Sequence, residues 1–229
     1  MPFLFDPTMI IVIPFILLML YAQYNVKTTF NKYLSVPAET AKTGADIARD
    51  ILRQNGLTEV AVEQTEGELS DHYDPRSNKV KLSPQVYQGN SLAAIGVAAH
   101  ETGHALQHAK GYMPVSIRSS LFPAANFGSQ TGPFLALIGF FFQAEFLILL
   151  GIIFFAGAVL FQVVTLPVEF NASSRALKIL KGNNYLSAKE TKGAKKVLRA
   201  AALTYVASTL VAIGHLLRLI FMFMLANDE

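Results

Sequence analysis

The sequence contains no cysteine and no tryptophan, and only 15% of its 229 residues are Asp, Glu, Lys or Arg. The lack of cysteine excludes disulfide bonds and thiolate metal ligands, so any metal site here must use histidine and carboxylate side chains. A hydrophobic content of 52% with so little charge departs from the average soluble protein and favours the membrane class. The net charge of +3 is modest, and we expect no nucleic-acid partner.

Charge is missing above all from four apolar runs, at 8–26, Pro123–Phe142, Glu145–Leu166 and Ala200–Leu225. Each is about long enough to cross a bilayer. We therefore predict a membrane anchor at 8–26, a transmembrane hairpin over 120–166 and a last transmembrane helix at 200–226. The first run follows no basic segment and precedes no small-residue cleavage site, so an uncleaved anchor is favoured over a signal peptide.

The basic residues are unevenly placed along the chain. Eighteen of the nineteen Lys and Arg residues lie in 27–118 or 175–199. The exception is Arg218, inside the last apolar run, with His215 one turn before it. The positive-inside rule places 27–118 and 167–199 in the cytoplasm. The prediction is a multi-pass protein of the cell (inner) membrane with both termini outside.

The segment 27–118 has the patterns of a small α+β domain. Thr43–Gln54 predicts a helix, and three β-type runs follow at Thr58–Gln64, Gly67–Tyr73 and Lys79–Leu82. Asp74–Asn78 supplies a turn between the last two runs. Two interpretations of this sheet stay open: its edge strand pairs with an extended peptide, or it is a structural hairpin.

One further predicted helix, Ser91–Lys110, carries His100-Glu101-Thr102-Gly103-His104. Residues four apart share one face of a helix, so two imidazoles at this spacing can hold one zinc ion. Glu101 lies beside them and can take a proton from a water molecule that the ion activates. The rest of this helix is almost wholly apolar, where two His and a Glu are costly unless they have a partner such as a metal.

A catalytic zinc needs a third protein ligand. His108 shares the stripe of His100 and His104, but eight residues of helix rise by about 12 Å, too far for one ion. Glu169 is the better candidate because it is the only carboxylate between Glu145 and Glu190. It lies in a helix, Val168–Leu180, that Pro167 is expected to begin. The membrane hairpin returns that helix to the side of the histidines.

The segments SDHYDPRSNKVKLS, AAHETGHALQH and LPVEFNASSRAL resemble the bacterial neutral zinc metallopeptidases of the YugP type. The likeness covers nearly the whole chain. The E-x-x-A pattern at Glu169–Ala172 is also similar to membrane zinc peptidases of the HtpX and CAAX prenyl protease kind. The resemblance implies a minigluzincin-like domain with Zn²⁺ on His100, His104 and Glu169 and with Glu101 as the base.

Those relatives have an Asp where this chain has Ser173. We therefore expect Asn171 or Ser173 to orient a ligand histidine more weakly than a carboxylate would. A second group that stabilises the transition state is usual in such enzymes. The candidates are His72, His108, Arg175, Tyr205 and His215, and the sequence does not choose among them. For His72 the preferred interpretation is a loop histidine beside the turn, and for His215 and Arg218 it is an intramembrane polar pair that stabilises helix packing.

The sequence therefore favours a membrane zinc metallopeptidase that cleaves membrane or juxtamembrane proteins. The alternative is a catalytically inert scaffold or adaptor that keeps the metal for stability. Retention of Glu101 speaks against the alternative, because a structural site needs no base. An intramembrane protease with an Asp ligand is excluded, since no Asp occurs between Asp74 and Asp228. The oligomeric state, a regulatory membrane partner and the substrate stay open.

Overall fold

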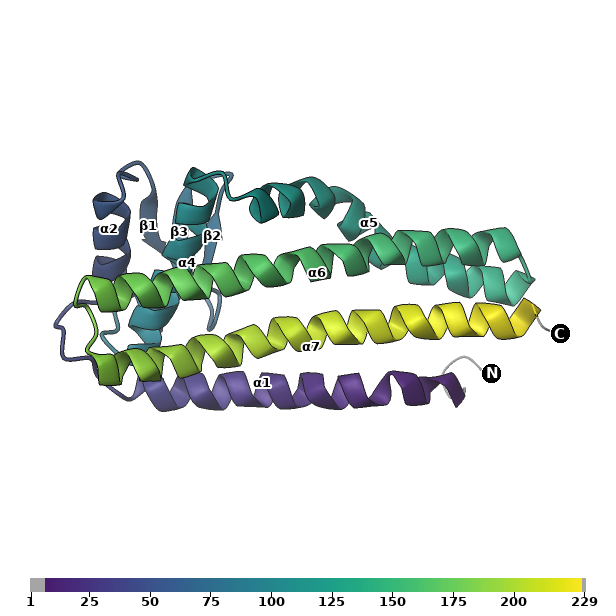
Figure 1. The fold of residues 1–229 in the computed structure, drawn as a ribbon, viewed down its shortest axis with the longest axis horizontal. Coiled ribbons are helices and arrows are strands. Elements are labelled where there is room, and N and C mark those ends of the chain that lie inside the picture. The colour runs from purple at the N-terminus through teal and green to yellow at the C-terminus, as the bar shows by residue number, and fades with distance from the viewer. Residues whose placement is uncertain (1–6, 228–229) are drawn as a thin grey trace. The chain divides into compact units, whose positions relative to one another are not determined.

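The computed structural model describes residues 7–227 (Figure 1). Its elements, in chain order, are η1 (Pro7–Ile11), α1 (Ile13–Leu34), α2 (Gly44–Gln54), β1 (Ala61–Gln64), β2 (His72–Asp74), β3 (Lys79–Leu82), α3 (Pro84–Tyr87), α4 (Leu92–Ala109), α5 (Met113–Phe142), α6 (Glu145–Gly182) and α7 (Ala188–Asn227). They form two compact units. Unit 1 contains 7–23, 116–167 and 204–227, and unit 2 contains 24–115 and 168–203.

Unit 2 contains a three-stranded sheet with the order β1-β3-β2. β1 pairs with β3 in parallel, and β2 pairs with β3 antiparallel. The predicted three-stranded sheet is confirmed, with β3 at its predicted bounds and β1 shorter than predicted. The run Gly67–Tyr73 is wrong in its bounds, because β2 begins at His72 and extends to Asp74, which was expected in the turn. Since β3 lies in the centre, β2 is an edge strand, and it also contacts α4.

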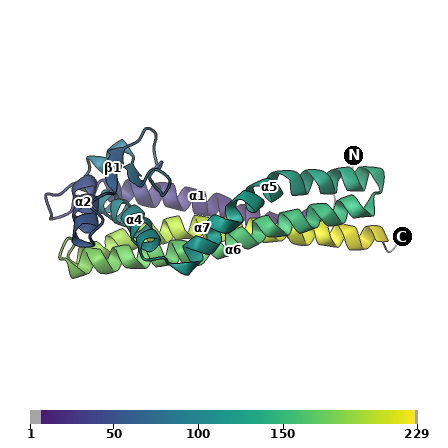
Figure 2. The same cartoon turned by 90° about the horizontal axis from the view of Figure 1, so that it is seen from above.

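The helix α4 is the centre of unit 2, as Figures 1 and 2 show. Ser91, just before the first residue of α4, is its N-cap: the Ser91 side chain accepts a hydrogen bond from the Ala94 N–H. One side of α4 packs through Ala98 on the sheet residues Val80 and Leu82. Another side packs through Ile95 on α2 and on the unit-2 parts of α6 and α7. The helix is held on several sides, which fixes the direction of the few polar side chains it carries.

Unit 1 contains the predicted helical hairpin. α5 ends at Phe142 and α6 begins at Glu145, so the polar break is the turn, and the two helices run antiparallel beside each other (Figures 1 and 2). They approach closely because Gly132 and Gly151 face each other. A Cβ on Gly132 would lie 2.8 Å from the Gly151 carbonyl oxygen. The glycines of this half of α5 thus pack against α6, whereas its polar residues Asn126, Ser129 and Gln130 are exposed.

The expectation of four membrane-spanning helices is wrong in number. Among the described residues, two helices, α6 and α7, are long and apolar enough to cross a bilayer. α1 falls short because the apolar run begins in η1, and Gln23, Asn25 and Lys27 occupy the second half of the helix. α5 falls short because the polar run 126–131 interrupts it. The anchor at 8–26 and the first span of the hairpin are therefore not supported.

Pro167 does not begin a helix. It lies inside α6, which is continuous from Glu145 to Gly182. Proline lacks an N–H, so the carbonyl of Val163, four residues before, loses its helical donor. Long apolar helices tolerate this loss because neighbouring groups compensate. The boundary between the two units nevertheless lies between Pro167 and Val168.

Candidate metal centre

The first two residues of the site lie one turn apart on α4. His100 and His104 point the same way, and their Nε2 atoms are 3.2 Å apart. Their rings meet edge to face, with centroids 4.8 Å apart. Both side chains are largely shielded from solvent, at 12% and 14% exposed. The predicted geometry of this motif is therefore present.

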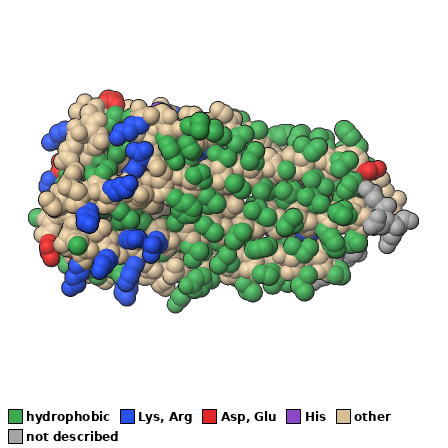
Figure 3. Space-filling view, in the orientation of Figure 1, with side chains coloured by type: hydrophobic (Ala, Val, Ile, Leu, Met, Phe, Trp, Pro, Cys, Tyr) green, Lys and Arg blue, Asp and Glu red, His purple; other side chains and the backbone are tan. Residues whose placement is uncertain are grey.

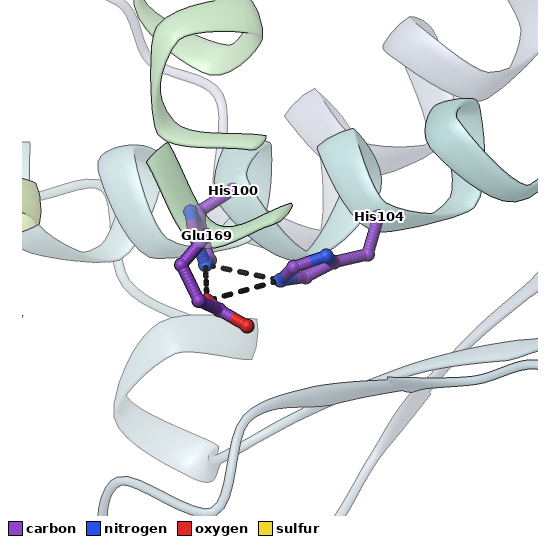
Figure 4. Close-up of side chains that lie close together, drawn as sticks. All are labelled: His100, His104 and Glu169. Carbon is purple, nitrogen blue, oxygen red and sulfur yellow. Dashed lines mark hydrogen bonds and ion pairs between the residues drawn. The ribbon is translucent and has the colours of Figure 1, made fainter. Parts of the chain in front are cut away.

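The third residue comes from α6. Glu169 is 2% exposed, and its Oε2 lies 3.4 Å from Nε2 of His100 and 3.5 Å from Nε2 of His104 (Figure 4). Among the described residues, this is the group of His and carboxylate side chains that could hold a metal ion. The structure thus brings Glu169 to the two histidines, as the sequence predicted.

The three distances match one tetrahedral ion. Zinc binds His nitrogen and carboxylate oxygen at about 2.0 to 2.2 Å, so neighbouring ligand atoms in a tetrahedron lie about 3.3 to 3.5 Å apart. The measured separations are 3.2, 3.4 and 3.5 Å. With an ion bound, the three protein atoms would occupy three corners and leave the fourth for another ligand, which is the donor set of a catalytic zinc site.

Gly103 allows α6 to reach the histidines. A Cβ on this residue would lie 2.9 Å from the carbonyl oxygen of Ala172. The backbones of α4 and α6 therefore come into close contact at Gly103 and Ala172, which lie one residue before His104 and three residues after Glu169. A larger residue at position 103 would separate the helices that supply the three ligand atoms.

The orientation of His104 depends on Gln107, which the sequence analysis missed. Gln107 is fully buried, and its Nε2 donates to the carbonyl of Val168 at 2.8 Å. This bond fixes the amide so that Oε1 faces Nδ1 of His104 at 3.0 Å. An amide oxygen can only accept, so Nδ1 carries the proton and the Nε2 lone pair of the neutral ring points into the site. A glutamine three residues after the histidine, in an otherwise apolar stretch, was the available signal.

Two predicted supporting residues lie beside the histidines. Ser173 Oγ is 3.1 Å from Nδ1 of His100. Asn171 acts one step further away: its Oδ1 accepts from Nε2 of Gln107 at 3.0 Å and from Nε of Arg175 at 2.6 Å. The Nδ1 atom of each histidine thus contacts a neutral polar side chain, as expected from the absence of an Asp at position 173.

Charges in the site are coupled. Burial alone would raise the pKa of Glu169, but its hydrogen bonds with His100 and His104 hold it far below its usual range. Burial would likewise lower the pKa of His104, yet the hydrogen bond with Glu169 and the charge of Glu101 raise it. A proton and a metal cation therefore compete for Nε2 of His104.

Glu101 lies near another carboxyl group, that of Asp71, which the sequence analysis did not single out. Glu101 is 8% exposed on α4. Asp71 lies just before β2 and accepts hydrogen bonds from the N–H and hydroxyl of Ser83. Burial raises the pKa of Asp71, and the negative charge of Glu101 raises it further. A buried carboxyl near a possible base is a common feature of functional sites.

The remaining candidates lie elsewhere. His108 is exposed, and its Nδ1 is 3.4 Å from the hydroxyl of Tyr73 on β2. His72 is exposed on β2, and its Nδ1 contacts the carbonyl of Ser70. Tyr205 belongs to unit 1. His108 thus lies next to the edge strand and outside the group of three, as its spacing predicted.

Arg175 and, on α7, Arg218 have structural contacts. The guanidinium of Arg175 lies 5.8 Å from the ring centre of Tyr112. In unit 1, Nε of Arg218 donates to the hydroxyl of Thr8 at 3.1 Å. Arg218 is 9% exposed, so this bond supports its interpretation as a helix-packing residue.

Residues 8–224 match the family described as "Putative neutral zinc metallopeptidase". The chain belongs to this family. It is also 50% identical, over 209 residues, to "Putative membrane protease YugP" of Bacillus subtilis (strain 168), which covers 91% of this chain and 93% of that relative. No solved structure matches the chain significantly. The YugP-type resemblance is confirmed, and the family's description agrees with zinc as the metal.

Proposed function

We propose that this protein is a zinc metallopeptidase whose metal is held by Nε2 of His100, Nε2 of His104 and Oε2 of Glu169. The observation that carries the proposal is the set of three separations between these atoms, 3.2, 3.4 and 3.5 Å. Such a set fits one tetrahedral ion and leaves one corner open. The family description supports both the metal and the reaction class.

The chain's own groups supply the proton transfers. Zinc, when bound, lowers the pKa of a water molecule and polarises the scissile carbonyl. The carboxylate of Glu101 accepts a proton from that water and later delivers it to the leaving amine nitrogen. Gln107 keeps His104 in the neutral tautomer that offers Nε2. Ser173 does the corresponding work at Nδ1 of His100.

The substrate is proposed to bind as an extended peptide along β2. This strand is the edge of the sheet, and Tyr73 on it reaches His108, one turn beyond His104. An exposed strand edge offers unpaired backbone groups to a peptide, and this pairing needs no particular side-chain sequence. Of the two interpretations of the sheet, the contact with α4 favours the one in which the edge serves binding.

The protein is proposed to be anchored in the cell membrane by α6 and α7, with unit 2 in the cytoplasm. In unit 1, large apolar side chains are exposed on α5 and α6, among them Phe141 at 80% and Phe146 at 73%. Between the apolar parts of α6 and α7, the segment 175–199 holds eight Lys and Arg residues. The positive-inside rule places such a segment in the cytoplasm. Membrane and juxtamembrane proteins are the substrates that this location favours.

The test compares metal content and proteolysis in three purified proteins. Wild type, Glu169→Ala and Glu101→Gln are prepared in detergent, loaded with zinc and analysed by mass spectrometry. We expect one zinc per chain in wild type and in Glu101→Gln, and loss of zinc in Glu169→Ala. With an unfolded protein as substrate, only wild type should cleave.

Two outcomes would contradict the proposal. Full zinc retention in Glu169→Ala would exclude Glu169 as a ligand. Equal cleavage by wild type and Glu101→Gln would show that the observed cleavage does not use Glu101 as the base. Zinc binding without any cleavage, combined with a large loss of stability when zinc is removed, would favour the inert scaffold.

A further inference from the structure

Unit 2 also has a cavity that does not include the three proposed metal ligands. A cavity of about 550 Å³ lies between the end of α6 and the beginning of α7. Its wall carries four cations: Lys178 and Lys181 from α6, and Lys195 and Arg199 from α7. Among the described residues that line it there is no Asp or Glu. It is therefore a site for a negatively charged ligand.

The four cations are not neutralised within the protein. All four are exposed, and in the part of the chain that the structure describes none forms an ion pair with a carboxylate. Glu190, the acidic residue of the same segment, is instead occupied by the backbone N–H groups of Glu39 and Ser187. Figure 3 shows Lys and Arg side chains gathered over the unit-2 ends of α6 and α7. The positive potential of this region is thus available to a ligand.

Part of the cavity lining is apolar, and we call this part its apolar floor. Phe170, Leu177 and Leu198 contribute to it, and Phe170 is 46% exposed. Hydroxyl groups of Ser174 and Thr191 lie in the same lining. A ligand that satisfies all of these surfaces carries a phosphate-like anion beside a hydrocarbon portion. A free inorganic anion would leave the apolar floor exposed to water.

The position of the cavity along the two helices points to a lipid. The apolar run of α6 ends at Leu166, one turn before Phe170, and the apolar run of α7 begins at Ala200, just before the lining residue Ala202. With α6 and α7 in a bilayer, as proposed above, the cavity lies at the level of the lipid headgroups on the cytoplasmic side. Basic pockets between helices at that level bind anionic headgroups.

We infer that this cavity binds the headgroup and upper acyl chain of an anionic phospholipid such as phosphatidylglycerol. The phosphate lies among Lys178, Lys195 and Arg199, and the acyl chain contacts Phe170 and Leu177. The cavity shares one wall residue with the metal centre, because Ser173 lines it and contacts His100. The bound lipid thus adjoins the α6 segment that presents Glu169.

The test measures lipid binding and uses zinc content as an independent check. Detergent-purified protein is mixed with equal amounts of phosphatidylglycerol and phosphatidylcholine, and bound lipid is counted by native mass spectrometry. We expect one phosphatidylglycerol per chain, bound in preference to phosphatidylcholine. In the triple variant Lys178→Gln, Lys195→Gln, Arg199→Gln, affinity for phosphatidylglycerol should fall about tenfold or more.

A matched triple variant, Arg53→Gln, Arg76→Gln, Lys110→Gln, removes the same charge from exposed positions of unit 2 outside the cavity. It should bind phosphatidylglycerol like wild type. Ser174→Phe keeps every charge but fills the cavity, and it should also lose the lipid. Excess inorganic phosphate should not displace the lipid, because phosphate cannot cover the apolar floor.

Three results would overturn the inference: equal losses in the two triple variants, full binding by Ser174→Phe, or displacement by inorganic phosphate. The first two would reduce the effect to general charge attraction, and the third would identify a site for free phosphate. Zinc per chain is measured in the same samples. Loss of lipid with zinc retained concerns the cavity alone, whereas loss of zinc concerns the proposed metal centre.

Discussion

At the scale of single residues, the metal centre depends on side chains that are not ligands. His104 can offer Nε2 to a cation because the amide of Gln107 accepts from Nδ1. Asn171 and Val168 both accept from Gln107, so its amide cannot turn over. Gln107, which is not a proposed ligand, thus selects the tautomer of His104, which is one.

Gln107→Leu should weaken zinc binding about 10- to 100-fold, the usual cost of losing such a supporting group. Leucine has a similar volume, so packing around α4 should be kept, while Nδ1 of His104 loses its acceptor. Zinc affinity can be measured by competition with a chelator of known affinity. Thr102→Val is the control, because Thr102 is also fully buried on α4 and its hydroxyl donates only to the Ala98 carbonyl. Equal affinity in Gln107→Leu and wild type would contradict the role of Gln107.

At the scale of elements, the approach of α4 and α6 decides whether the ligands meet. Gly103→Ala should abolish stoichiometric zinc binding and destabilise the protein by about 1 to 3 kcal/mol, because the added methyl group would overlap the Ala172 carbonyl. Zinc content and the midpoint of thermal unfolding in detergent check this. Gly182→Ala is the control, since nothing lies within 4 Å of a Cβ there. Wild-type zinc content in Gly103→Ala would show that the helices can separate without harm.

The N-terminus of α7 gives a pH-dependent prediction. Burial would raise the pKa of Glu190, but hydrogen bonds from the N–H groups of Glu39 and Ser187 lower it below its ordinary 4.5. Because the folded pKa is lowered, the stabilisation is present above about pH 4.5 and is lost as the pH falls through the lowered pKa.

Glu190→Gln should therefore cost about 1 kcal/mol at neutral pH, the usual contribution of a helix cap. The difference in stability between the variant and wild type should shrink as the pH falls below 4.5, because the carboxylate of wild-type Glu190 becomes protonated and, like the amide of glutamine, uncharged. Thermal unfolding in detergent across pH 3 to 7 measures both proteins. Glu66→Gln, at an exposed turn position, should show no such difference. A stability difference between Glu190→Gln and wild type that stays constant at all pH values would show that the effect comes from side-chain shape and not from charge.

At the scale of the whole molecule, the proposed membrane topology rests on α6 and α7. The chain has no cysteine, so single-cysteine variants report accessibility without background. With a maleimide that does not cross membranes, Glu145→Cys should react in intact spheroplasts. Lys192→Cys, between the two apolar helices, should react only after lysis. The reverse pattern would invert the orientation, and reaction of both variants in intact spheroplasts would exclude a membrane crossing by α6.

The sequence by itself determined the parts of this protein that depend on local pattern. Four-residue spacing on a helix places His100 and His104 together whatever surrounds them. Alternation and turn residues predicted the strands, and the lone carboxylate in a long stretch identified Glu169. The uneven distribution of Lys and Arg along the chain can likewise be read from the sequence without knowledge of the fold.

Only the tertiary structure decided what depends on contacts between distant segments. The orientation of the Gln107 amide is set by its hydrogen bond to the carbonyl of Val168, sixty-one residues later in the chain. Pattern alone could not show that α6 continues through Pro167, because packing compensates one lost hydrogen bond. The number of candidate membrane-spanning helices is two instead of four, because α1 begins only at Ile13 and has a polar second half, and because the polar run 126–131 interrupts α5.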